Sequence, residues 1–227
     1  MIEKGLIYVL IGDKYAFTGF PHWEMCKKSV GSVKLHCPDL HVTLITESEV
    51  RDDDPGFDNV IVLEVDDKKY MHPWTYKLMA SLGSPYEKTI LLDVDTRVHS
   101  NRLLEIYSIL GRFDIAAALS HVVIGFDRDN GSIEDLDYIP ASCSEHNVGV
   151  LGFVKNDKTN DCWKYMIEMM NTHQSYDERW LRKYRYGHPE LLVETLPPQF
   201  NLRSSAILTS SNFLQNTVVE HHHGIWK

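Results

Sequence analysis

Two aspartates, Asp93 and Asp95, stand one residue apart at the end of an apolar run that begins at Thr89. Residues i and i+2 of an extended chain point to the same side, so both carboxylates can face one hard cation. A divalent ion held there could bridge to the phosphates of a nucleotide. The alternative is a solvated turn rich in aspartate, which is the more common origin of an isolated Asp-x-Asp.

Three consecutive histidines, His221 to His223, follow a strand predicted at residues 217–219. An imidazole beside a pair of carboxylates would complete a mixed oxygen and nitrogen site of the kind that binds Mn²⁺. A surface position without any ligand is the other interpretation of such a run. We interpret the histidines as native sequence and not as part of a purification tag, since the chain continues from them through Gly224 to Lys227.

The net charge of −9 over 227 residues limits the classes of partner. Nucleic acids and anionic membranes both favour a basic protein surface, so neither is expected. An anionic small molecule remains compatible with this charge if a metal ion and a few cations offset the repulsion. The content of 43% hydrophobic and 24% charged residues is typical of a globular protein, and the length predicts a single domain over residues 1–227.

The cysteines are scattered and form no C-x-x-C pair; they are Cys26, Cys37, Cys143 and Cys162. Reduced thiols in a cytoplasmic protein are the simplest interpretation of this pattern. The apolar run at residues 5–11 is too short for a membrane span, and no signal-peptide cleavage site follows it. We therefore expect a cytoplasmic protein without an integral membrane segment.

Alternating strands and helices indicate an α/β fold. Continuous apolar runs predict strands buried on both faces, and amphipathic stretches predict the helices between them. The expected strands cover residues 6–11, 41–46, 60–65, 89–92, 114–119, 148–153 and 217–219. The expected helices cover about residues 23–35, 71–82, 103–110, 161–171 and 176–184. Ligands are expected at the loops that follow the C-terminal ends of the parallel strands.

Two further segments have a predicted role. Residues 120–143 are rich in turn formers and could close over a site as a loop. Trp163, Met166 and Met170 share one face of a predicted helix, which favours core packing over contact with a cofactor.

Taken together, these motifs resemble the metal-dependent glycosyltransferases of the GT-A fold, most closely those of family 8. That family carries an Asp-x-Asp after an apolar strand and a His-x-x-Gly-x-x-Lys motif near its C-terminus. Asp93-Val94-Asp95 matches the first motif, and His221 to Lys227 match the second in their spacing. The resemblance implies a Rossmann-like nucleotide-diphospho-sugar transferase domain, with a mixed central sheet flanked by helices. It also implies Mn²⁺ or Mg²⁺ held by Asp93, Asp95 and His221.

The resemblance further implies where a nucleotide-sugar donor would lie. The segment from Gly12 to Ala16 follows the first strand and resembles the family's base loop, in which a tyrosine, here Tyr15, stacks on uracil. Lys77 stands where the family has a basic residue that reaches the donor, and residues 147–150 resemble the strand beside the donor sugar. The implied donor contacts are Ile11, Gly12, Asp13, Tyr15, Lys77, Asp93, Val94, Asp95, Gly149, Gly224 and Lys227.

The same resemblance implies catalytic roles for Asp177, Glu178 and Asn147. Asp177-Glu178 occupies the region where the family shows Asp-Gln, so the glutamate is a departure from the family pattern. Phe200-Asn201 resembles a Phe-Asn segment of the family. Structural alternatives remain for several positions: Tyr15 as a core cap, Lys77 as a solvated lysine, Asn147 as a turn residue and Asp177 as a helix N-cap.

The activity that the resemblance implies is that of a hexosyltransferase. A sugar would move from a nucleotide diphosphate sugar, UDP-linked, to a hydroxyl of a glycan or other acceptor, with retention. One alternative is a non-catalytic module that binds nucleotide sugars. Another is a phosphohydrolase of the haloacid dehalogenase type, which also has Asp-x-Asp after a strand; that class has Thr or Val where this chain has Arg97.

Overall fold

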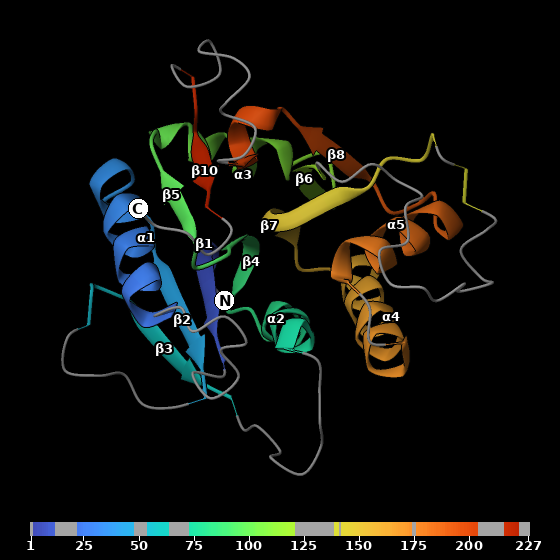
Figure 1. The fold of residues 1–227 in the computed structure, drawn as a ribbon, viewed down its shortest axis with the longest axis horizontal. Helices are drawn as coiled ribbons and strands as arrows, with labels where there is room; N and C mark the ends of the chain where they lie inside the picture. The colour runs from blue at the N-terminus through green and yellow to red at the C-terminus, as the bar shows by residue number, and fades with distance from the viewer. Residues whose placement is uncertain are drawn as a thin grey trace.

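The computed structural model describes residues 2–11, 22–47, 54–63, 73–120, 139–140, 142–173, 176–203 and 216–222. Within these ranges, seven strands form one mixed sheet in the order β3-β2-β1-β4-β7-β6-β8 (Figure 1). They are β1 (Ile2–Leu10), β2 (Val42–Thr46), β3 (Asn59–Val62), β4 (Tyr86–Leu92), β6 (Ile115–Leu119), β7 (His146–Val154) and β8 (Val193–Leu196). A smaller sheet contains β5 (Thr96–Val98), β10 (Val219–His221) and β9 (Leu202–Arg203).

Strand direction gives the large sheet one functional edge. β3, β2, β1 and β4 are parallel, and β7 runs antiparallel to both β4 and β6. β8 is parallel to β6. Six strands therefore end at the edge where β7 begins, which we call the carboxyl edge. Ligand sites of α/β sheets are found at this kind of edge.

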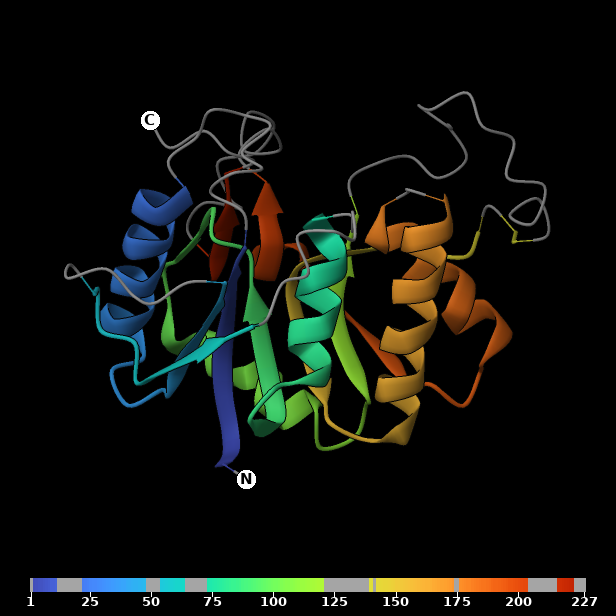
Figure 2. The ribbon, with the colours of Figure 1, turned by 90° about the horizontal axis from the view of Figure 1, so that it is seen from below.

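Helices cover both faces of the large sheet (Figure 2). On one face lie α1 (His22–His36), α3 (Glu105–Ile109), the 3₁₀ helices η2 (Asn101–Leu104) and η4 (Pro198–Asn201), and the small sheet. On the other face lie α2 (Pro73–Leu82), α4 (Asp157–His173) and α5 (Asp177–Gly187). Within the described ranges, no helix is both long enough and apolar enough to cross a membrane.

Each face of the sheet has its own hydrophobic core. Tyr8 and Val150 belong to the core under α1, whereas Ile7 and Leu151 belong to the core under α2, α4 and α5. Neighbouring residues of a strand point to opposite faces, so a strand between two cores must be apolar at every position. All nine residues of β7 except the last are buried, as this position requires.

The predicted α/β fold with a mixed central sheet flanked by helices is confirmed. The stripe of Trp163, Met166 and Met170 is fully buried in the second core, so its predicted packing role is also confirmed. α4 begins earlier than predicted, at Asp157, because the Asn156 side chain accepts a hydrogen bond from the Thr159 amide over 3.0 Å. Strands β5, β8 and β9 were not predicted, because these segments of two to four residues contain no continuous apolar run.

Candidate active site

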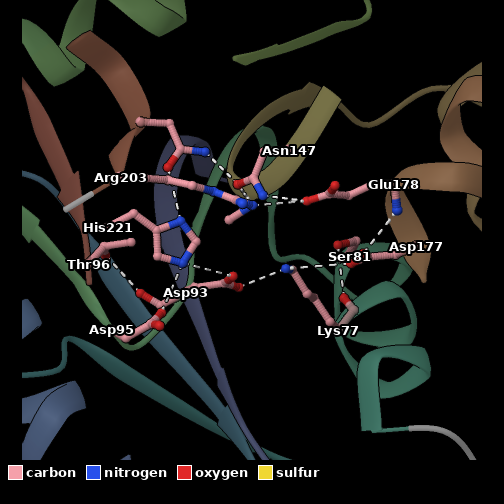
Figure 3. Close-up of polar contacts among 12 residues, drawn as sticks. Lys77, Ser81, Asp93, Asp95, Thr96, Asn147, Asp177, Glu178, Arg203 and His221 are labelled. Atoms are coloured by element: carbon pink, nitrogen blue, oxygen red, sulfur yellow. Dashed lines mark hydrogen bonds and ion pairs between the residues drawn. The ribbon is translucent and has the colours of Figure 1, made fainter. Parts of the chain in front are cut away.

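The carboxyl edge brings Asp93, Asp95 and His221 together (Figure 3). The two aspartates follow β4, and His221 is the last residue of β10. Their ligand atoms all lie within 4.8 Å of one another. His221 Nε2 lies 3.2 Å from Asp95 Oδ1 and 3.7 Å from Asp93 Oδ2. Two carboxylates and an imidazole that converge in this way are a donor set suited to Mn²⁺.

Strand pairing places His221 beside the aspartates. β10 pairs antiparallel with β5, and His221 stands opposite Thr96, the residue that follows Asp95. The amide of His222 donates a hydrogen bond to the Asp95 carbonyl over 2.9 Å. Backbone hydrogen bonds of the small sheet therefore join two distant parts of the sequence into one cluster.

A buried hydrogen bond orients the imidazole of His221, which is 3% exposed. Nδ1 lies 3.0 Å from Asn201 Oδ1, an oxygen that can only accept, so Nδ1 carries the proton. The other ring nitrogen, Nε2, then faces the two carboxylates. Asn201 in turn donates from Nδ2 to Asn147 Oδ1 over 2.5 Å. Partners of this kind fix the ring orientation of metal-binding histidines.

Gly149 in β7 provides the space for that imidazole. A Cβ at this position would overlap the ring of His221 and would lie 2.9 Å from Asn147 Oδ1. The Gly149 carbonyl also accepts a hydrogen bond from the Asp93 amide over 2.8 Å. Gly149 therefore supports both the histidine and the aspartate side of the cluster.

Asp93, Asp95 and His221 form a candidate metal cluster, and Asn147 links this cluster to the acidic start of α5. It lies where the pairing of β6 with β7 changes register, and such bulges redirect side chains near active sites. Its Oδ1 accepts from the Gly149 amide over 3.0 Å, so the local side-chain bond considered as an alternative is present, but within strand β7 and not in a turn. Its Nδ2 donates to Glu178 Oε1, so Asn147 also contacts a predicted catalytic residue.

Lys77 on α2 lies between two carboxylates and is 8% exposed. Its Nζ lies 2.7 Å from Asp93 Oδ1 and 3.6 Å from Asp177 Oδ2. Burial alone would lower the pKa of the Lys77 ammonium, but the charges of Asp93 and Asp177 outweigh burial and raise this pKa. Lys77 is therefore a buried, charged residue, and the alternative of a solvated lysine is wrong.

Asp177 is the first residue of α5 and is buried. The N-cap position belongs to Tyr176, so Asp177 is not the N-cap considered as an alternative. Its Oδ1 accepts from the Glu178 amide over 3.0 Å. Burial raises the pKa of the Asp177 carboxyl, and the Lys77 charge partly offsets this effect.

Glu178 is held by groups from three elements. Oε1 accepts from Asn147 Nδ2 and lies 3.5 Å from the Arg203 guanidinium, and Oε2 accepts from Ser120 Oγ over 2.7 Å. Burial, with a further contribution from the Asp177 charge, raises the pKa of the Glu178 carboxyl to about 7. Both protonation states of Glu178 are therefore accessible near neutral pH.

Three residues of this site were not assigned from the sequence: Asn201, Arg203 and Ser120. Asn201 belongs to the Phe200-Asn201 segment, which the family resemblance had singled out without giving it a role. Arg203 in β9 and Ser120 after β6 belong to no sequence motif that would mark them as site residues. Arg203 is placed by the pairing of β9 with β10, and Ser120 by the pairing of β6 with β7.

The remaining predicted donor contacts divide into two groups. Ile11 follows β1 at the carboxyl edge and is half-buried, and Val94 packs its side chain against the core under α1. Gly12, Asp13, Tyr15, Gly224 and Lys227 lie outside the described residues, as does most of the predicted loop at 120–143. Their roles stay predictions.

The described part of the site has an excess of negative charge. It contains the carboxyl groups of Asp93, Asp95, Asp177 and Glu178, together with the cations of Lys77 and Arg203. A diphosphate would be repelled here unless a divalent cation lay in the Asp93, Asp95 and His221 cluster.

Comparisons with known proteins connect this fold with glycosyltransferases. No protein-family model and no curated protein matches the sequence. The galactosyltransferase LgtC, solved with donor and acceptor sugar analogues, has a TM-score of 0.63 and 16% identity over 96% of this chain and 87% of its own. An active-site variant of LgtC in which glutamate replaces glutamine also has a TM-score of 0.63, over 98% and 88% of the two chains.

Two larger glycosyltransferases contain the same fold. The apo form of the bifunctional enzyme WbbM has a TM-score of 0.70 and 12% identity, and this chain spans 46% of its length. The apo form of GlyE from Streptococcus pneumoniae TIGR4 has a TM-score of 0.63 and 14% identity, with 55% of its length spanned. Both matches cover 100% of this chain. The chain therefore has the fold of these glycosyltransferases, as the resemblance of its motifs implied.

Proposed function

We propose that this protein is a metal-dependent glycosyltransferase of the retaining type. It moves a sugar from a UDP-linked donor to a hydroxyl of a glycan or other acceptor. The observation that carries this proposal is the convergence of Asp93, Asp95 and His221 at the carboxyl edge of a glycosyltransferase fold. The donor and acceptor analogues in the LgtC structure support the same ligand classes here. The four free cysteines support a cytoplasmic location.

The residues fit the cation that the fold implies. The cluster offers two carboxylates and the Nε2 nitrogen of an imidazole held at Nδ1 by Asn201, a donor set that would suit Mn²⁺ or Mg²⁺. When bound, the cation would stabilise the negative charge that develops on the leaving diphosphate.

Lys77 acts on the donor side of this reaction. Its ammonium holds Asp93 in place over 2.7 Å and brings a permanent positive charge to the diphosphate position. Lys227, which lies outside the described residues, is proposed to add a second positive charge there. No strong general acid is then needed, because the leaving diphosphate is stabilised as an anion.

Asp177, Glu178 and Asn147 act on the sugar side. A carboxylate near the anomeric carbon stabilises the positive charge that develops there as the bond to diphosphate breaks. Ser120, Asn147 and Arg203 fix the Glu178 carboxyl in one orientation, which such stabilisation requires. LgtC has an active-site glutamine that was changed to glutamate, and the family resemblance implies a glutamine where this chain has Glu178, which supports a role for Glu178 in the reaction.

A panel of nucleotide sugars tests the proposed function. Thermal stabilisation and donor hydrolysis are measured with Mn²⁺ and then with EDTA, since hydrolysis requires no knowledge of the acceptor. We expect one UDP-sugar to stabilise the protein and to be hydrolysed slowly, and both effects to be lost in EDTA. Stabilisation without any hydrolysis or transfer would favour the non-catalytic binding module. Neither effect with any donor would contradict the proposal.

A further inference from the structure

Two aromatic residues are close in the chain to the ion pair of Lys77 and Asp177. Trp74 lies on α2 three residues before Lys77, on the same side of the helix, and Tyr176 directly precedes Asp177. The ring centroids of Trp74 and Tyr176 are 4.8 Å apart, and the ring planes are tilted by 33°. We call these two residues the aromatic pair.

The aromatic pair is attached to the core but is not enclosed by it. Trp74 is half-buried and packs against the core under α2, α4 and α5. Tyr176 is 50% exposed, whereas Trp180 and Tyr184 on the same helix are buried. Exposed aromatic surface beside a cluster of polar groups is a common feature of ligand sites.

The position of Lys77 relates the aromatic pair to the proposed donor. Lys77 lies between Asp93 of the metal cluster and Asp177 of α5 (Figure 3). A diphosphate at the metal cluster would therefore direct the donor sugar towards Asp177 and Glu178. Because Trp74 lies one helical turn before Lys77 and Tyr176 directly precedes Asp177, the backbone of the aromatic pair flanks the ion pair of Lys77 and Asp177, near where an acceptor would approach that sugar.

We propose that Trp74 and Tyr176 bind a pyranose ring of a carbohydrate acceptor; this inference rests on the proposed function. One face of a pyranose presents C–H groups, which pack on an aromatic face, and its hydroxyls lie around the rim. The tyrosine hydroxyl can exchange hydrogen bonds with that rim. Aromatic rings give this contact area at low cost in side-chain entropy, because each has two χ angles.

The first experiment uses the wild-type protein with the UDP-sugar that the donor panel identifies. UDP release is measured with Mn²⁺ and methyl pyranosides of glucose, galactose, mannose and N-acetylglucosamine as acceptor probes, and with glycerol as an acyclic control. We expect at least one pyranoside to raise UDP release above glycerol. No stimulation while donor hydrolysis continues would overturn the acceptor site and leave the proposed function standing. The absence of donor binding and hydrolysis would instead overturn the proposed function.

The second experiment compares substitutions of the aromatic pair. We expect Trp74→Leu and Tyr176→Leu to lower kcat/KM for the stimulating pyranoside about tenfold, mainly through KM, with the donor KM for hydrolysis changed by less than about twofold. Tyr176→Phe keeps the ring and should retain most of the transfer. Because Tyr176 is half-exposed, its variants should fold even if Trp74→Leu does not.

Tyr186 supplies a matched control on the same helix. It is 51% exposed and lies at the far end of α5 from Tyr176. Tyr186→Leu should leave transfer to the pyranoside unchanged. An equal loss in Tyr186→Leu would overturn the acceptor site, and so would a matching loss of donor binding in Tyr176→Leu, because the aromatic pair would then serve the donor.

Discussion

At Gly149, the single methyl group of an alanine side chain would collide with a residue of the candidate metal cluster. A Cβ there would overlap the imidazole of His221, and β7 cannot move away without disturbing the hydrogen bond from the Asp93 amide. Protein interiors do not absorb such an overlap without displacing a neighbour. The neighbour that would move is the imidazole, since it lies at the end of a short strand.

We expect Gly149→Ala to weaken Mn²⁺ binding by about tenfold or more, which corresponds to about 1.4 kcal/mol. Calorimetric titration with Mn²⁺ in the presence of UDP measures this change. Gly31→Ala is the matched control, because a Cβ at this helical position meets no atom within 4 Å. Unchanged Mn²⁺ affinity in Gly149→Ala would remove His221 from the proposed ligand set.

Glu178 gives a second prediction at this scale, which concerns stability and pH. Its carboxyl pKa is about 7 in the folded protein and 4.5 in an ordinary environment. The folded state therefore binds the proton more tightly, so the stability from this group is present below about pH 4.5 and is lost as pH rises through about 7. Glu178→Gln removes this pH-dependent loss of stability, because glutamine does not ionise.

We expect Glu178→Gln to gain stability relative to the wild type between pH 5 and pH 8, by up to about 3 kcal/mol in the free energy of unfolding. Urea denaturation of both proteins at the two pH values measures the difference. Glu190→Gln makes the same change at an exposed position and is the matched control. If the stability difference were the same at both pH values, Glu178 would not have the raised pKa.

At the scale of elements, three hydroxyl groups connect β1 and α1 with the turn that carries Asp93 and Asp95, the proposed metal ligands. Tyr8 OH lies 2.7 Å from Ser29 Oγ, Ser29 Oγ lies 3.1 Å from Thr96 Oγ1, and Thr96 Oγ1 donates to the Asp93 carbonyl over 2.7 Å. A hydroxyl has one proton, so Ser29 donates to Thr96 and Tyr8 donates to Ser29. Burial raises the pKa of Tyr8, which keeps the first proton in place.

We expect Tyr8→Phe to lower the free energy of unfolding by about 1 kcal/mol and to weaken Mn²⁺ binding, because Ser29 loses its donor and the Asp93 turn loosens. Denaturation and calorimetry measure the two effects. The control is Tyr107→Phe, since the buried hydroxyl of Tyr107 has no hydrogen-bond partner among the described residues. A normal Mn²⁺ affinity in Tyr8→Phe would mean that the three hydroxyls do not position the metal ligands.

At the scale of the whole molecule, the negative charge of the protein opposes binding of the proposed nucleotide diphosphate. The chain carries a net charge of −9. Several of its carboxyl groups are concentrated at the place where a diphosphate would lie. Both features oppose an anionic ligand. A divalent cation at the Asp93, Asp95 and His221 cluster would reverse the sign of the local field.

We therefore expect UDP affinity to fall by about a hundredfold or more when EDTA removes the metal, which corresponds to about 2.7 kcal/mol. Titration of UDP with Mn²⁺ and with EDTA measures this dependence. Asp95→Asn keeps the shape of the side chain and should reproduce the loss even with Mn²⁺ present. Equal UDP affinity with and without metal would show that the cluster does not bridge to the diphosphate.

The sequence by itself determined the fold class and the three residues of the proposed metal site. Apolar runs and helical periodicity are local patterns, so they gave the main strands and helices. The spacing of Asp93 and Asp95 placed two carboxylates on one side of the chain, and the family resemblance added His221, Lys77, Asn147 and the acidic pair at the start of α5. These signals lie within a few neighbouring residues, which is why they can be read without a structure.

The tertiary structure decided everything that depends on distant partners. The pairing of β10 with β5 and β9 brings His221 to the aspartates and Arg203 to Glu178, and such short strands form only against a partner. The burial of Lys77 and the pKa of Glu178 depend on which groups surround them. The contact of Trp74 with Tyr176 joins α2 to the start of α5. No local pattern encodes such distances, because each arises from the packing of elements far apart in the chain.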